Sequence, residues 1–206
     1  ASMDLVNIPL LKYIASKRKP ILLSTGMGSL SEIEKAVQTI EKEGNNQIVL
    51  LHCVSIYPPE YEDINLNNIL MLRNAFGYPV GFSDHTIGTS IPLASVALGA
   101  CVIEKHFTTD KDLPGWDHLI SADPAELQVI STESKNISKS LGSYRRIVSK
   151  AEEEKKIKFR RSIVLTRDLK KGYCLKAEDL TSKRPGTGIS PDYMDMIIGK
   201  ELINDV

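Results

Sequence analysis

The sequence predicts an α/β fold, with a parallel sheet followed by a small, mostly β module. Apolar, β-rich runs start every 22 to 32 residues or so, with helix-like segments between them, which is the period of βα units. Two of these runs end in a polar residue and a histidine two positions apart. The character of the chain changes after Gly142, where a charged stretch precedes short β-like segments. Together these features predict two modules.

The expected strands of the first module are four apolar runs, at residues 20–24, 47–57, 79–83 and 101–107. Helix signals lie between and after them: a capping-box pattern, glycine stop signals and a proline in a first turn. The segments that carry these signals are residues 29–42, 65–76, 90–98 and 124–141.

The second module is expected to begin after a linker. We place the end of the first module at residue 145, a linker or solvated helix at 146–160, and the small module at 161–206. Residues 161–165 predict a short strand, and the loop at 183–188 is rich in glycine and proline. The first five residues resemble the tail of a strand, which suggests an internal piece of a longer protein.

The composition excludes several classes of function. Lysine plus arginine and aspartate plus glutamate balance at 26 each, so no basic field favours nucleic acid or an anionic membrane. No apolar run approaches the length of a membrane span. The three cysteines are scattered and predict buried packing residues in a reducing, cytoplasmic location. A small-molecule substrate is therefore favoured.

Two strand ends carry the most informative residues. Residues two apart in a strand point to the same face, so Ser83 faces with His85, and Glu104 faces with His106. Such a pair of strand ends, joined by one helix, predicts a site at the carboxyl edge of a parallel sheet. Lys105 has the opposite parity and is expected to point away from the histidines.

Several motifs along the chain resemble the sialic acid (N-acetylneuraminate) synthase family, which includes legionaminic and pseudaminic acid synthases and spore coat polysaccharide synthases. The resemblance covers essentially the whole chain. It implies the second half of a TIM (β/α)₈ barrel followed by a small antifreeze-like (SAF) domain. The motifs are 22–27, 51–58, 82–86, 104–108, 114–118 and 183–186, which read LLSTGM, LHCVSIYP, FSDHT, EKHFT, PGWDH and KRPG.

The resemblance implies a transferase that condenses phosphoenolpyruvate with an N-acylated mannosamine-type sugar. The product is a nine-carbon sialic acid-like 2-keto acid for surface polysaccharide biosynthesis, and phosphate is released. The family uses a divalent metal, Mn²⁺ rather than Mg²⁺ by preference, and exchanges its small domain across a homodimer. The resemblance assigns the metal to His85 and His106, with Glu104 as a third catalytic residue. Phosphoenolpyruvate is assigned to Ser24, Ser55, Tyr57 and Ser83, and the sugar to Asp117 and Arg184.

Each assignment has a plainer alternative. A strand-end serine is usually a cap, a histidine is usually a satisfied hydrogen-bonding residue, and Glu104 could pair with a lysine. Ser2 and Asp4 stand where the family has a phosphate-binding serine and an acidic residue. Other functions are a different sugar-condensing barrel enzyme or aldolase, and a non-catalytic fragment that binds ligand and dimerises. A Schiff-base aldolase would need a lysine on the histidine face, which Lys105 does not offer.

Overall fold

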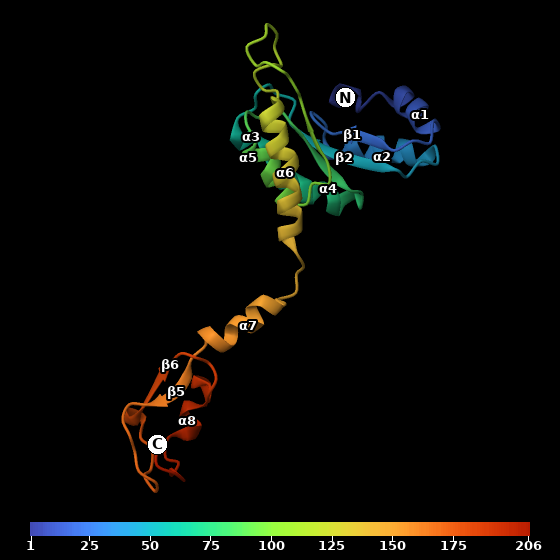
Figure 1. Cartoon of the computed structure of the whole chain (residues 1–206). Helices are drawn as coiled ribbons and strands as arrows, with labels where there is room; N and C mark the ends of the chain where they lie inside the picture. Colours follow the sequence, from blue (N-terminus) through green and yellow to red (C-terminus); the bar gives the residue numbers. More distant parts are fainter. The chain divides into compact units, whose positions relative to one another are not determined.

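The structure, a computed structural model, describes residues 1–206 and divides them into two units, Ala1–Gly142 and Ser143–Val206 (Figure 1). The division falls three residues before the end expected for the first module. Each unit has its own apolar core. No helix combines the length and the hydrophobicity needed to cross a membrane.

The first unit is built on a four-stranded parallel sheet in the order β1-β2-β3-β4. This is the parallel sheet that the sequence predicts, with strands adjacent in sequence adjacent in space. The second strand is shorter than predicted, because pairing with β3 ends at Cys53 and leaves the next residues in a loop. The strands are β1 (Ile21–Ser24), β2 (Ile48–Cys53), β3 (Val80–Asp84) and β4 (Ile103–Lys105).

Helices follow the strands, as the βα period predicts. The capping box predicted at Ser29 forms, since its hydroxyl accepts from the backbone N–H of Glu32. The long helix begins and ends where predicted, and Asp123 caps it. The helices are α2 (Leu30–Lys42), α3 (Tyr61–Ile64), α4 (Asn68–Phe76), α5 (Ser90–Ala97) and α6 (Pro124–Leu141).

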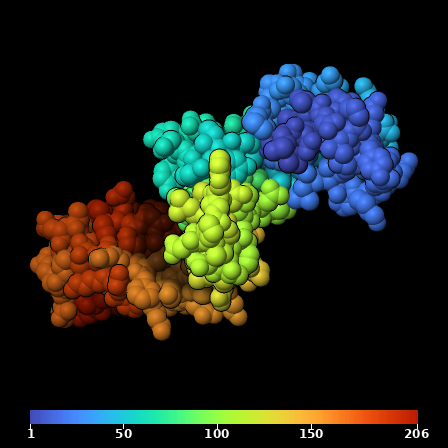
Figure 2. Space-filling model, turned by 90° about the horizontal axis from the view of Figure 1, so that it is seen from above, coloured from blue at the N-terminus to red at the C-terminus, as the bar shows by residue number.

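The beginning of the chain differs from the prediction. It forms a 3₁₀ turn, η1 (Ser2–Asp4), and a helix, α1 (Ile8–Ser16), instead of the tail of a strand. The side chain of Asn7 caps α1, and Leu11 and Ala15 are buried on one of its faces. In Figure 2 this dark-blue segment lies at the surface among the lighter blue residues of its own unit.

The core of the first unit lies between the sheet and its helices, and Phe82, Ile40 and Leu50 are among its fully buried side chains. Of the three cysteines only Cys53 is buried, so the prediction of packing cysteines is wrong for Cys101 and Cys174. Both follow a glycine-containing turn or loop that leaves them at the surface.

The loop between β4 and α6 stands clear of the helices of its unit in Figure 1, and in Figure 2 it is the yellow-green surface nearest the viewer. Phe107 and Ala122 pair at its base. Trp116, within this loop, is 96% exposed, so its side chain is not packed against the rest of the unit.

The small module at 161–206, predicted to be mostly β, contains two four-residue strands, one four-residue helix and two 3₁₀ turns, so strands do not dominate its regular structure. The charged stretch forms a helix with no buried residue. Its small core comprises Leu169, Leu175 and Leu180. The elements are α7 (Lys150–Phe159), the antiparallel strands β5 (Ser162–Leu165) and β6 (Leu180–Lys183), α8 (Met194–Ile197), and the 3₁₀ turns η2 (Ala177–Asp179) and η3 (Pro191–Tyr193).

Candidate functional site

The carboxyl ends of the four parallel strands surround a cavity of about 440 Å³. Each strand contributes a polar side chain to it, and the loops that follow β2, β3 and β4 contribute more. This is the edge of a parallel sheet at which α/β proteins place their ligands. The polar side chains that line the cavity are Ser2, Ser24, Cys53, Ser55, Tyr57, Ser83, His85, Glu104 and His106.

The β3 and β4 ends place the predicted pairs side by side. Ser83 and Glu104 are register partners, and the Ser83 hydroxyl donates to Glu104 Oε1 at 2.7 Å. Two residues further along each strand direction lie His85 and His106, whose ring centroids are 5.3 Å apart. Glu104 therefore pairs with a hydroxyl in the site, and the alternative of an ion pair with lysine does not form.

Tyr57 forms a wall beside both imidazoles. Its ring centroid is 4.1 Å from that of His85 and 5.9 Å from that of His106. His85 Nδ1 lies 2.8 Å from the backbone oxygen of Val54, which fixes the ring orientation. Burial lowers the pKa of His85, but hydrogen bonds with Cys53 and Val54 outweigh it and raise the pKa above the usual value.

His85 and His106 are the side chains of the cavity that could hold a divalent ion. A ligating histidine characteristically uses its other ring nitrogen for a backbone or carboxylate partner, as His85 does with Val54. No group of three or more histidine, cysteine, aspartate or glutamate side chains is placed to hold an ion. Two protein ligands leave several coordination positions for water and substrate oxygen, which suits an octahedral ion better than structural zinc.

A second set of polar groups lies on the β1 and β2 side of the cavity. The Ser2 and Ser24 hydroxyls are 2.7 Å apart, and Ser2 Oγ lies 3.5 Å from Cys53 Sγ. Ser55 Oγ is 3.8 Å from the same sulfur. Hydroxyls that converge at a sheet edge are suited to an anion with several oxygens.

Gly26 keeps this hydroxyl cluster open. A Cβ at this position would lie 2.4 Å from Ser55 Oγ and 2.6 Å from Ser2 Oγ. Only glycine leaves that space free for a ligand. Gly26 lies two residues after the end of β1, where a glycine is a sequence signal for close backbone approach.

Cys53 is a site residue that the sequence reasoning missed, because a lone cysteine in an apolar run indicates packing. Burial opposes ionisation of its thiol. Hydrogen bonds with His85 and with the hydroxyls of Ser2, Ser24 and Ser55 more than offset burial and lower the pKa from 9.0 to about 6.

Two predicted sugar-binding residues lie outside the cavity lining. Asp117, in the exposed loop, has its Oδ2 3.8 Å from His106 Nδ1. Arg184 belongs to the second unit, where its guanidinium lies 5.3 Å from the centre of the Phe159 ring. Seven of the nine predicted site residues therefore line the cavity. Asp117 lies beside it, next to His106, and Arg184 belongs to the second unit.

Other polar residues near the strand ends have structural roles. His52 is buried with Nε2 2.6 Å from the oxygen of Ile64, and burial lowers its pKa. Asp84 accepts from the N–H of Thr86, which braces the loop. Lys105 points to the opposite face of the sheet and pairs with Asp84, so it offers no amine for a Schiff base in the cavity.

The fold and the cavity define the class of protein: an α/β protein of parallel βα units that carries hydroxyls and two imidazoles at the carboxyl ends of its strands. Comparison with known proteins identifies the family. Residues 1–146 match the NeuB family, and residues 160–206 match the SAF domain. The chain therefore belongs to the NeuB family.

Individual relatives agree with this assignment. The chain is 47% identical to an uncharacterised protein of Methanocaldococcus jannaschii over 100% of its own length and 61% of the relative's. It is 44% identical to the N,N'-diacetyllegionaminic acid synthase of Legionella pneumophila, over 98% of the chain and 58% of the relative. It thus spans about 60% of these curated relatives.

A solved structure shows the same similarity. The N-acetylneuraminic acid synthetase of Leptospira borgpetersenii, crystallised with citrate, superposes with a TM-score of 0.70 at 44% identity. The match covers 75% of the chain and 54% of that protein. Over three quarters of this chain, the fold is therefore that of a solved sialic acid synthetase.

Proposed function

We propose that this chain carries the catalytic half of a synthase that joins phosphoenolpyruvate to an N-acylated mannosamine-type sugar. A carbon–carbon bond forms between C3 of phosphoenolpyruvate and the sugar aldehyde carbon. Water adds at C2 and phosphate leaves, which gives a nine-carbon 2-keto acid. The observation that carries this proposal is the cavity in which a hydroxyl cluster lies beside two neighbouring imidazoles.

The four strands are, in this proposal, the second half of a (β/α)₈ barrel. The parallel order, the βα connections and the similarity to the sialic acid synthetase structure support it. The complete barrel would bring further side chains to the same edge of the sheet. The free cysteines favour a reducing compartment, so we place the reaction in the cytoplasm.

Phosphoenolpyruvate would bind at the hydroxyl side of the cavity. Ser24 and Ser55 line the space that Gly26 leaves open, and they can donate to phosphate oxygens. Ser83, the register partner of both Cys53 and Glu104, and Tyr57, whose ring lies beside His85, would hold the carboxylate and the reacting carbon. Glu104, fixed by Ser83, is placed to hold a water or to move a proton at that carbon.

His85 and His106 would hold a divalent metal, Mn²⁺ by preference to Mg²⁺ because imidazole suits the softer ion. When bound, the ion would polarise the sugar aldehyde. The protein's own part is to hold the two rings beside each other and beside the ring of Tyr57.

Asp117 and Arg184 would contact the sugar. Asp117 lies beside His106 and can accept hydrogen bonds from sugar hydroxyls. Arg184 lies in the SAF unit, next to the aromatic ring of Phe159. We propose that it reaches the N-acyl group at the barrel of a second polypeptide in a homodimer that exchanges its small domains.

The test is phosphate release from phosphoenolpyruvate by the full-length gene product, with N-acetylmannosamine or a diacetamido analogue as acceptor. The second sugar is included because relatives 44% identical to this chain are named N,N'-diacetyllegionaminic acid synthases. We expect sugar-dependent release with Mn²⁺ that chelator and His85→Ala both reduce by about 10²–10³-fold, the order of a lost electrostatic catalyst. His118→Ala, which changes a histidine of the exposed loop, is the matched control.

Release with neither sugar from a folded protein would contradict the proposed reaction. Release that is indifferent to His85→Ala and to chelator would contradict the metal assignment alone. The sugar that gives the higher kcat/KM identifies the acceptor.

A further inference from the structure

Behind the two histidines, on the opposite face of the sheet, lies a buried ion pair. Lys105 Nζ is 2.7 Å from Asp84 Oδ2 and 2.5 Å from the backbone oxygen of Thr86. The two side chains are 3% and 0% exposed. Asp84 Oδ1 also accepts from the N–H of Thr86 at 2.9 Å. Three residues at two strand ends are therefore joined by three hydrogen bonds, and the two charged side chains are almost fully buried.

The place of this pair in the sheet links it to the site. Asp84 and Lys105 are register partners, the last such pair of β3 and β4. His85 follows Asp84 directly, and His106 follows Lys105. Side chains of adjacent residues point to opposite faces, so the pair on one face determines how the two chains continue into the imidazoles on the other.

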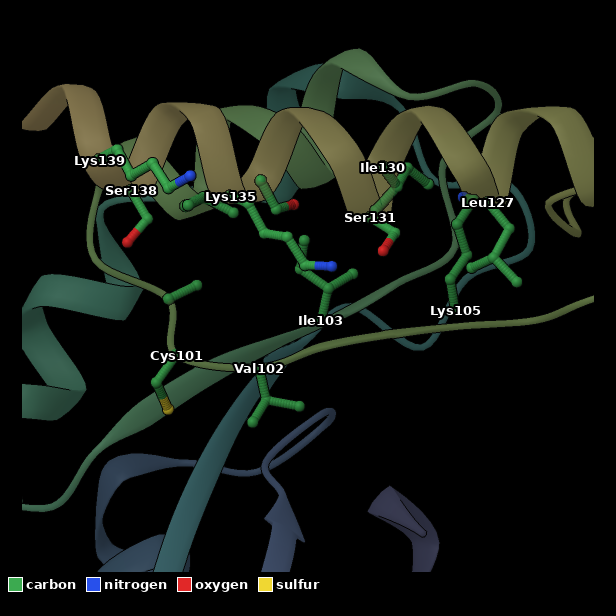
Figure 3. A pocket seen from close by; sticks show the side chains of 13 residues that line it. Cys101, Val102, Ile103, Lys105, Leu127, Ile130, Ser131, Lys135, Ser138 and Lys139 are labelled. Atoms are coloured by element: carbon green, nitrogen blue, oxygen red, sulfur yellow. The ribbon is translucent and has the colours of Figure 1, made fainter.

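Helix α6 keeps the pair away from water. Lys105 lies at one end of a groove of about 640 Å³ between α6 and the segment that leads into β4 (Figure 3). Its side chain lies close to Leu127 of α6 in this view. The groove is larger than the cavity described above. Apolar side chains and exposed lysines form most of its lining, and Lys105, the buried charge in it, is already paired with Asp84.

A buried ion pair at such a place is not explained by stability. Its desolvation offsets most of its attraction, so a well-packed apolar pair would serve a core equally well. What an apolar pair lacks is directional bonding, which fixes one strand end relative to the next. The same two residues also tie the backbone of Thr86, one residue beyond His85.

We infer that the Asp84–Lys105 ion pair is a positioning device that sets the spacing and orientation of His85 and His106. This inference deepens the proposed function and rests on it for the metal. Asp84 and Lys105 do not line the 440 Å³ cavity, although both border a smaller pocket of about 200 Å³ beside the histidines. Their charges are paired there with each other, so neither offers a free ligand and both act on the rings by position. Their loss is expected to separate the rings or tilt them, and to weaken metal binding without removing a ligand.

The test compares the wild type with Lys105→Met, which keeps the length of the side chain and removes its charge. Lys111→Met is the matched control, because Lys111 forms a more exposed ion pair with Glu126 at the base of α6. The first readout is the NOE between the His85 and His106 rings in metal-free, histidine-labelled protein. The second is the Mn²⁺ dissociation constant from electron paramagnetic resonance.

We expect Lys105→Met to lose the ring-to-ring NOE and to raise the Mn²⁺ dissociation constant by about 10–100-fold, the usual cost of an altered outer partner of a metal ligand. Lys111→Met should change neither readout. Should Lys105→Met unfold, Asp84→Asn carries the same test, since it keeps the shape and the acceptor for the Thr86 N–H. Lys105→Arg should restore part of the affinity.

A folded Lys105→Met or Asp84→Asn protein with the wild-type NOE and wild-type affinity would overturn the inference. If the wild type shows the NOE and binds no Mn²⁺, the metal part of the proposed function fails. Loss of the NOE in Lys105→Met would still support the positioning role in that case.

Discussion

The two units of this chain are stabilised in different ways. The first has sixteen buried apolar residues in one cluster, and its polar site is confined to one edge of the sheet. The second has three, and an arginine–aspartate pair lies directly beside them. A large core can support buried polar groups that serve a ligand, because apolar burial offsets their desolvation. A small core needs its polar contacts for the fold itself.

The largest expected difference follows from one apolar truncation in each unit. Leu175→Ala and Phe82→Ala each remove a buried side chain. They should lower the free energy of unfolding by about 2–5 and 3–5 kcal/mol, respectively. Leu175 is one of three buried residues in its cluster, so its loss should abolish hydrogen-exchange protection throughout Ser143–Val206. Phe82→Ala should leave the first unit folded with weaker protection. Equal loss in both units would contradict the comparison.

A smaller effect is expected from acid. Hydrogen bonds from Arg167 and from the Lys176 N–H hold the pKa of Asp179 below its usual value, although burial opposes them. Because the folded carboxyl has the lower pKa, its contribution to stability is complete above the unfolded value of about 3.9 and is lost as the pH falls through the folded value.

The measurement for Asp179 is the melting of the second unit between about pH 6 and pH 2.5. Asp179→Asn should melt earlier than wild type at pH 6 and should depend less on pH below 4. Other carboxyls also have lowered pKa values, among them Asp205, so the difference between the two proteins isolates Asp179. Parallel pH curves would show that this carboxyl does not matter.

The smallest expected effect concerns two matching capping boxes. Ser29 caps α2 and Ser149 caps α7, each by accepting from the N–H of a glutamate three residues on. Replacing either serine by alanine costs about 1 kcal/mol of helix stability. Helix α2 buries five residues in the core, so Ser29→Ala should weaken exchange protection across the first unit. Helix α7 buries none, so Ser149→Ala should affect only the helix itself.

Much of this protein follows from local sequence pattern. The strand runs, the capping box at Ser29 and the helix at 124–141 were all predictable, because hydrophobic period and capping residues act over a few neighbours. Strand parity likewise placed Ser83 with His85 and turned Lys105 away from them. Two elements were missed. Helix α1 was missed although Asn7 is a strong N-cap residue and Pro9 lies in its first turn. The end of β2 was missed because the partner strand decides it.

The tertiary structure alone decided which polar residues contact one another. Local pattern could not show that Ser2, Ser24, Cys53 and Ser55 form one cluster, since their separations along the chain reach 53 residues, and only the family resemblance grouped the serines. Nor could it pair Asp84 with Lys105, because that bond depends on the register of two strands. Local periodicity fixes which face a residue points to, whereas register and packing fix what it meets there.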